Sequence, residues 1–393
     1  MNCAVARKKK PVPRADQLSG FKLLERFRAL FAGLDARRSK SAREMDPRRH
    51  FDAEGYFVMM LFTLLNPVID SMRGLCAVSK FKRFEAGTGL GPVSLASFSE
   101  AQSVFDAELL RGVLRELLAS RKDSLSKDLR GKLGERELEA IDSTIWEVIP
   151  RMGWAFWREQ GGKRHHGVRL HLCWRIFGAG CGGAELTPAR ECEQRTLRHD
   201  LVVPGIVYVG DRNYSTNYGL LERIAEVGSD FIVRLPQRAV FKELAALPLS
   251  AAERAAGITH HVRVALGDEK PIDRGWRVVR MIIPGTGEPL IILTSLPEDS
   301  LGAADLCEVY RRRWSIEMFF RWLKCTLPCR HWLAESPNGV AVQVYISLIA
   351  ALLLAGRDGK LPGKREMEAI RLWQTGWIED DELQQALAAQ KRR

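Results

Sequence analysis

The sequence offers little that would place it in a membrane or in an oxidising compartment. No apolar targeting stretch follows its basic start. Its eight cysteines are scattered over 393 residues, which indicates reduced thiols in a cytoplasm. Only residues 339–356 form a nearly continuous apolar run, and no second run of this length accompanies them. We therefore expect a helix buried in a globular domain there, and no contact with a membrane.

The composition predicts a folded protein with two or three domains. A chain of 393 residues exceeds what one core usually holds, and 46% apolar with 27% charged residues is ordinary for a soluble fold. The net charge is +12, and residues 1–50 contribute +9 of it, with 14 Lys and Arg against 5 Asp and Glu. A basic arm before a nearly balanced body suits a phosphate-binding protein, although a solvated, solubilising tail explains the same count.

The first third of the chain has the apolar spacing of helices. We expect a basic arm over residues 1–50, interrupted by a short amphipathic helix, and a helical DNA-binding domain over residues 51–125. Lys80, Lys82 and Arg83 are candidates for a second DNA contact in that domain. A helical bundle with a solvated basic edge explains these three residues equally well.

Strand-like and helical segments mix from residue 130 onward, which indicates an α/β fold. Short strand-like segments are predicted at 140–146, 168–174, 205–211 and 231–235, of which 168–174 alternates, and a helix is predicted at 218–227.

Residues 236–297 are predicted to form a β-rich insertion. A short helical segment is expected first, followed by strand-like runs at 260–266, 276–283 and 290–294. The catalytic domain then comprises residues 130–235 and 298–357, and residues 358–393 form a helical tail.

Two aspartates stand at strands, where the backbone can fix a carboxylate rigidly. Asp142 lies near the start of one predicted strand and Asp211 at the end of another. In-line cleavage of a phosphodiester uses two cations, and Mg²⁺ prefers oxygen ligands, so a few carboxylates suffice to hold them. Aspartates at strand ends are also common in turns, and this pair alone is a weak signal.

A third acid, Glu317, lies in a segment with a more specific pattern. Residues 310–324 are predicted to form one helix, on which five side chains share a narrow stripe: Tyr310, Arg313, Glu317, Arg321 and Lys324. A lone Glu on a helix is usually a salt-bridge partner. Among three cations and an aromatic ring, this Glu suits a carboxylate that binds metal while its neighbours bind phosphate and stack on a base.

These residues match the Tyr-(2)-Arg-(3)-Glu-(6)-Lys signature of bacterial insertion-sequence DDE transposases of the insertion-sequence-four type. The match is complete at Tyr310, Arg313, Glu317 and Lys324. The block Ile141-Asp-Ser-Thr resembles the family's first-aspartate motif, and Gly210-Asp-Arg-Asn-Tyr resembles its second. The resemblance spans roughly residues 135–355.

The resemblance implies an RNase H-like catalytic core with a β-rich insertion and an N-terminal helical domain. Asp142, Asp211 and Glu317 would then be the catalytic residues and would bind two Mg²⁺ or Mn²⁺ ions. DNA contacts are expected from the remaining signature residues and their neighbours: Tyr310, Arg313, Lys324, Arg321 and Arg212. Arg212 also has a simpler explanation, a pair with a neighbouring acid.

The resemblance further implies a cytoplasmic, nucleoid-associated protein that works on double-stranded DNA. Family members bind the terminal inverted repeats of their element, pair as a homodimer across two DNA ends, and cut and paste the element into target DNA. A relative carries a Trp just before a strand of the insertion, where it stacks on a flipped base, but Pro289-Leu-Ile-Ile-Leu-Thr-Ser has none. Either Trp276 takes this role from a neighbouring strand, or this protein handles the base differently.

Two other functions fit the same residues. A stand-alone nuclease of this fold would cut DNA without joining it. A domesticated DNA-binding protein would no longer react, but all three acids are intact, which argues against this alternative.

Overall fold

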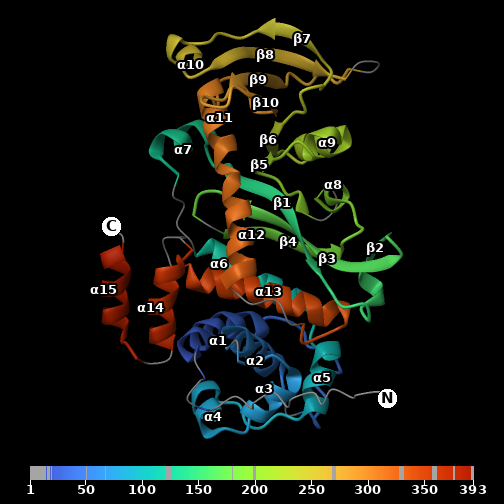
Figure 1. Ribbon diagram of the computed structural model, residues 1–393, viewed down its shortest axis with the longest axis vertical. Helices are drawn as coiled ribbons and strands as arrows, with labels where there is room; N and C mark the ends of the chain where they lie inside the picture. Colours follow the sequence, from blue (N-terminus) through green and yellow to red (C-terminus); the bar gives the residue numbers. More distant parts are fainter. Residues whose placement is uncertain are drawn as a thin grey trace, which may run out of the picture. The chain divides into compact units, whose positions relative to one another are not determined.

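The computed structural model describes most of the chain, in two compact units (Figure 1). The described residues are 15, 18, 20–49, 51–66, 68–120, 125–178, 180–197, 201–267, 271–326, 332–355, 361–374 and 377–390. The first unit falls within Met1–Leu117, Leu323–Gly356 and Leu361–Arg393, and the second within Leu118–Trp322 and Arg357–Lys360.

The first unit is helical. Its helices are α1 (Phe21–Asp35), α2 (Ala53–Leu65), α3 (Met72–Val78), α4 (Lys82–Thr88), α5 (Leu95–Val104), α6 (Glu108–Ala119), α13 (Pro337–Leu354), α14 (Lys364–Gln374) and α15 (Asp380–Gln390). Every residue of α2 except Glu54 is buried, because this apolar helix contacts α1, α5 and α13. Helices α1 to α6 occupy most of residues 21–119, where the apolar spacing of the sequence indicates helices.

The described part of the basic arm is built into this unit. Leu23, Phe27 and Phe31 of α1 are buried. Several of its cations pair with acids of the same unit: Arg28 with Glu54 at 3.3 Å, Arg37 with Glu116 at 2.7 Å, and Arg49 with Glu100 at 2.8 Å. The charge count over residues 1–50 therefore overstates the basic surface that these residues offer to phosphate.

Helix α13 contains the long apolar run of the sequence. It is long and apolar enough to cross a membrane, but 83% of it is buried inside the protein. Its first turn is anchored by Asn338, whose amide donates to the carbonyls of Gln102 (2.7 Å) and Phe105 (2.8 Å). These bonds and the contacts with α2 explain why α13 groups with the N-terminal helices, whereas the sequence pattern predicts residues 298–357 as part of the catalytic domain.

The second unit is built on a ten-stranded mixed sheet. Its strands are β1 (Glu137–Glu147), β2 (Phe156–Gln160), β3 (Lys163–Arg175), β4 (Gly180–Pro188), β5 (Ile206–Gly210), β6 (Asp230–Arg234), β7 (Phe241–Ala246), β8 (Ile258–Leu266), β9 (Arg277–Ile282) and β10 (Pro289–Thr294). They run in the order β2-β3-β1-β5-β6-β10-β9-β8-β7, with β4 also paired to β3. The β1–β5 and β5–β6 pairs are parallel, and the other pairs are antiparallel. The predicted α/β class is confirmed.

Both faces of this sheet are covered, because apolar residues occupy both sides of its central strands. On β6, Phe231 and Val233 pack in a core with α9 (Tyr218–Glu226), while Ile232 between them packs in a second core with α11 (Ala303–Arg312). The sheet therefore lies between α9 and α11 (Figure 1).

The predicted β-rich insertion contributes β7 to β10 to the same sheet, joined through the β6–β10 pair. Its three strand-like runs correspond to β8, β9 and β10. The expected short helical segment is instead a strand, β7, and a five-residue helix, α10 (Ala251–Ala255). Pairing with β8 overrides the helix-favouring residues of β7.

Candidate active site

Asp142 lies on β1 at the point where this strand loses one neighbour. The parallel pairing with β5 ends at Ala140 opposite Val209, so the next residues of β1 have an open edge. Ile141 packs in the core on the α9 side, and strand alternation therefore directs Asp142 to the α11 side. The backbone N–H of Ser143 donates to its carboxylate at 2.7 Å.

Asp211 directly follows β5. Asp211 follows Val209 by two residues, as Asp142 follows Ala140, the residue opposite Val209, and the charge of Asp211 acts on Asp142 and raises its pKa. The backbone N–H of Asn213 donates to the Asp211 carboxylate at 2.9 Å, which holds the turn after the strand. The two predicted acids are thus brought together by the parallel strand pair.

Glu317, the third acid, is linked to Asp142 by the side chain of Arg313. The predicted single helix is wrong in one detail: α11 ends at Arg312, and α12 (Trp314–Thr326) begins two residues later. The Arg313 guanidinium bonds to the carboxylate of Glu317 and lies 3.6 Å from the carboxylate of Asp142. Arg313 therefore links the first acid to the third.

Negative charge accumulates around Asp142. The pKa of its carboxyl is raised to about 6, chiefly by burial and also by the nearby charges of Asp211 and Glu193, against the opposing effects of Ser143 and Arg313. Among the described residues, no three His, Cys, Asp or Glu side chains already form a group able to hold one metal ion. The donor atoms are carboxylate oxygens, which suit Mg²⁺ or Mn²⁺, and a cation would relieve the repulsion, so the residues fit a divalent metal site.

The remaining signature residues occupy different environments. Tyr310 is half-buried, and burial raises its pKa, opposed by the neighbouring Arg313. Arg212 and Arg321 are exposed. Lys324 stands in the last turn of α12, where burial lowers the pKa of its ammonium group.

The DNA-contact role predicted for Trp276 is not supported by its position. Its side chain is 2% exposed and packs edge-on against Phe231, with ring centroids 5.0 Å apart, in the core on the α9 side. A ring buried in this way has no free face for a DNA base. Its role is packing.

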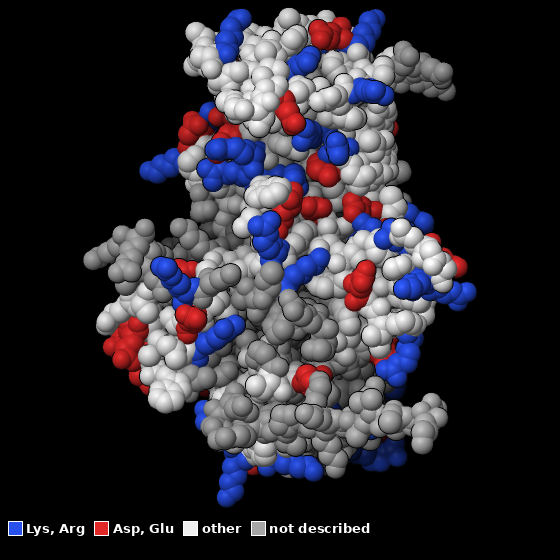
Figure 2. Space-filling view, viewed as in Figure 1, with Lys and Arg blue, Asp and Glu red and all other residues white. Residues whose placement is uncertain are grey.

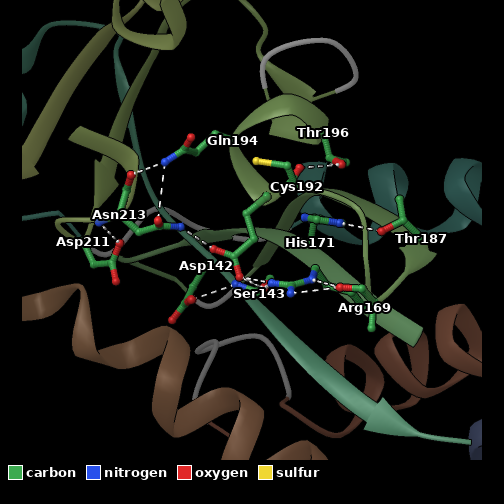
Figure 3. A network of polar contacts seen from close by, with 12 residues as sticks. Asp142, Ser143, Arg169, His171, Thr187, Cys192, Gln194, Thr196, Asp211 and Asn213 are labelled. Atoms are coloured by element: carbon green, nitrogen blue, oxygen red, sulfur yellow. Dashed lines mark hydrogen bonds and ion pairs between the residues drawn. The ribbon is translucent and has the colours of Figure 1, made fainter. Parts of the chain in front are cut away.

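Sequence reasoning missed Glu193, at the start of the short helix α8 (Glu193–Thr196) that follows β4. Its carboxylate accepts hydrogen bonds from Ser143, Arg169 and Asn213, in the network drawn in Figure 3. Arg169 also donates to the carbonyl of Ala189 at 3.1 Å. No motif marks Glu193 in the sequence, because only the fold brings it beside the two aspartates.

Basic side chains surround this acidic cluster. Figure 2 shows both signs of charge on the face that carries α11 and α12, with carboxylates bordered by Lys and Arg. Such a surface can hold a cation at its centre and a polyanion across its rim.

Comparison with known proteins identifies the family. The transposase DDE domain matches residues 134–353, more than half of the chain and a range that contains all three acids. The chain belongs to this family. A protein of Sinorhizobium fredii named as the transposase y4zB is 28% identical over 251 residues, which are 61% of this chain and 64% of that protein. A protein of Synechocystis sp. named for the transposase of the insertion sequence element IS4SA is 24% identical over 270 residues, 67% of this chain and 71% of that protein.

The chain thus spans just under two thirds of the length of the first of these relatives. The chain also aligns over 95% of its length with 84% of a piggyBac transposase, from a synaptic complex with hairpin DNA, at 10% identity and a TM-score of 0.37.

Proposed function

We propose that Asp142, Asp211 and Glu317 hold two divalent metal ions, Mg²⁺ or Mn²⁺, with which this transposase cuts and rejoins DNA. The observation that carries the proposal is the juxtaposition of the three acids. The charge of Asp211, directly after β5, raises the pKa of Asp142 on β1, and Arg313 contacts the carboxylates of both Asp142 and Glu317. These contacts support a common site for three acids that are widely separated in the sequence.

The sheet supports an RNase H-like core for the catalytic part. In that core the antiparallel strands β1, β3 and β4 are followed by the parallel strands β5 and β6, with helices on both faces. Strand acids on the central pair of such a sheet are held by a rigid backbone.

The bound ions would activate the attacking oxygen and stabilise the leaving one. The protein's own part is to place the carboxylates and to neutralise phosphate. In the first step, a water oxygen attacks the phosphorus at the element's end, the P–O3′ bond breaks, and the element is left with a 3′-hydroxyl. In the second, that 3′-hydroxyl attacks a target phosphodiester, a new P–O bond forms, and the target's P–O3′ bond breaks.

DNA would be held by cations around the acids. The exposed Arg212 and Arg321 suit phosphate contacts, and Tyr310, Arg313 and Lys324 suit the terminal phosphates and a displaced base. In the helical unit, Lys80, Lys82 and Arg83 are exposed and suit a further phosphate contact. We propose that the protein binds terminal inverted repeats as a homodimer, at the nucleoid in the cytoplasm.

Replacement of Glu317 by Gln tests the proposal. The change keeps the size of the side chain and removes its charge, so cleavage of a duplex carrying one terminal inverted repeat should fall at least about 1,000-fold with Mg²⁺, while binding of that duplex changes little. The control is Glu308→Gln on α11, whose carboxylate pairs with Arg311 and Arg312.

The products separate the alternatives. A stand-alone nuclease would cut the end but give no strand-transfer product with paired ends and target DNA. A domesticated DNA-binding protein would bind the end, and the wild type itself would never nick it. Normal cleavage by Glu317→Gln would contradict the proposed metal site.

A further inference from the structure

Glu193 is bonded to residues that follow both proposed strand acids. Its Oε1 accepts from the hydroxyl of Ser143 and from the guanidinium of Arg169, and its Oε2 accepts from the amide Nδ2 of Asn213 at 2.9 Å. The side chain is 19% exposed. One carboxylate therefore bridges β1 and the turn after β5.

Ser143 and Asn213 each donate a second hydrogen bond, from the backbone N–H, to the carboxylate of an aspartate. The backbone N–H of Ser143 donates to Asp142 at 2.7 Å, and that of Asn213 donates to Asp211 at 2.9 Å. Figure 3 shows these bonds in one continuous network with Gln194 and Arg169. The path from Glu193 to either aspartate thus passes through a single residue.

We propose that Glu193 is a positioning residue that fixes Ser143 and Asn213 and thereby sets the separation of Asp142 and Asp211. This role rests on the function proposed above for the two aspartates. It is distinct from a metal ligand's role, because the residue acts through the donors that orient the ligands.

The geometry favours positioning over direct ligation. Strand alternation directs Ser143 to the face opposite Asp142, so Glu193 reaches the pair from the far side of β1. Its two oxygens already accept three donors, and the charge of Arg169 offsets its own. A carboxylate bound in this way has little capacity left for a metal ion.

The neighbouring residue holds α8 in place. The side-chain amide of Gln194 donates to the carbonyl of Asn213 and to the hydroxyl of Thr216 at 3.0 Å. These hydrogen bonds hold α8 against the turn after Asp211, and the backbone of Glu193 is therefore fixed relative to that turn. Partners of this kind commonly change metal affinity about 10- to 100-fold when they are removed.

The experiment measures Mn²⁺ binding by the full chain in complex with a duplex carrying one terminal inverted repeat, through the electron paramagnetic resonance signal of free Mn²⁺. Glu193→Ala should raise the dissociation constant about 10-fold, and Glu193→Gln, which keeps one acceptor, should raise it less. Excess Mn²⁺ should restore cleavage by Glu193→Ala. The control is Glu191→Ala, two residues earlier, whose carboxylate lies 3.9 Å from Arg190 and should leave binding unchanged.

A double-mutant cycle identifies the route. If Glu193 acts through Ser143, the change Ser143→Ala should weaken Mn²⁺ binding, and the double variant should bind no more weakly than Glu193→Ala alone. Strictly additive effects would overturn the proposal, because they would make Glu193 an independent ligand. Equal binding by Glu193→Ala and Glu191→Ala would also overturn it.

Asp142→Asn separates this inference from the proposed function. If Asp142→Asn abolishes Mn²⁺ binding and excess metal does not restore cleavage, the metal site stands whatever Glu193 does. If Asp142→Asn binds Mn²⁺ and cleaves normally, the proposed function fails, and the role of Glu193 fails with it.

Discussion

Two parts of the second unit each have a largely buried arginine, and the two side chains have different partners: backbone carbonyls for Arg277 and carboxylates for Arg313. Arg277 on β9 is 1% exposed and donates to the carbonyls of Leu296 (2.8 Å), Pro297 (2.9 Å) and Leu301 (3.2 Å). The Arg313 side chain, 12% exposed, faces the carboxylates of Asp142 and Glu317.

The difference separates a structural cation from a functional one. If the Arg277 side chain moved away, the carbonyls that it bonds would lose their hydrogen-bond donor. This arginine therefore fixes the segment that leads from β10 into α11. Acids around Arg313 repel one another, and each can take a different cation. We infer that β7 to β10 make this part of the fold rigid. Around β1 and β5, the clustered carboxylates lower the stability of the folded protein, and this loss is tied to function.

The largest effect on stability is expected from Arg277→Met. Three carbonyls, of which those of Leu296 and Leu301 are in buried hydrogen bonds, would lose their donor, so the free energy of unfolding should fall by about 3 kcal/mol. Arg313→Met should lower it by at most about 1 kcal/mol, because the facing carboxylates remain partly solvated. Urea denaturation of both variants measures the difference.

The two variants should rank in the reverse order in their effect on the rate of DNA cleavage. Arg313→Met should slow cleavage about 100-fold, as expected when one preorganised cation is lost, and Arg277→Met should leave it near the wild-type rate at a temperature where the variant is folded. Equal losses of stability in the two variants would break the comparison.

A smaller stability change is expected from Asp142→Asn, with the opposite sign. The folded pKa of about 6 exceeds the ordinary value, so ionised Asp142 destabilises the fold above pH 6 and has no such cost below about pH 4, where it is protonated in both states. Removing the charge should therefore stabilise the protein by about 2 kcal/mol at pH 7.5. Thermal unfolding from pH 4 to 8 without added metal measures this, and a gain that grows toward low pH would contradict it.

The smallest effect concerns cations of the helical unit. Lys82 and Arg83 are exposed, whereas the Arg48 guanidinium lies 2.9 Å from the Asp46 carboxylate. If the first two contact DNA phosphate, each change to Ala should reduce the slope of log affinity against log salt by about 1. Arg48→Ala is the control and should change the slope less, as measured by fluorescence anisotropy at several salt concentrations.

Much of the catalytic sheet could be predicted from the sequence. The alternation of apolar residues at 205–211 and 231–235 predicted β5 and β6, because strands of a buried sheet are recognisable by composition. Asp211 stood out because it follows the end of β5, Asp142 because it lies in the strand predicted at 140–146, and the spacing from Tyr310 to Lys324 marked the third acid.

Features that depend on distant partners could not be predicted. Strand β4 has three glycines within Gly180–Pro188, too little apolar pattern to mark a strand, and it forms because β3 pairs with it. The segment Phe241–Ala246 resembles a helix in composition and is a strand because β8 lies beside it. Glu193 has no local motif, and its importance comes from the partners that the fold supplies.

Anomalous scattering from crystals of the full chain grown with Mn²⁺ would test the metal site most directly. We predict Mn²⁺ peaks with oxygen ligands from Asp142, Asp211 and Glu317, and with Arg313 outside the ligand set. Peaks bound by other residues, with the three carboxylates apart, would contradict the account.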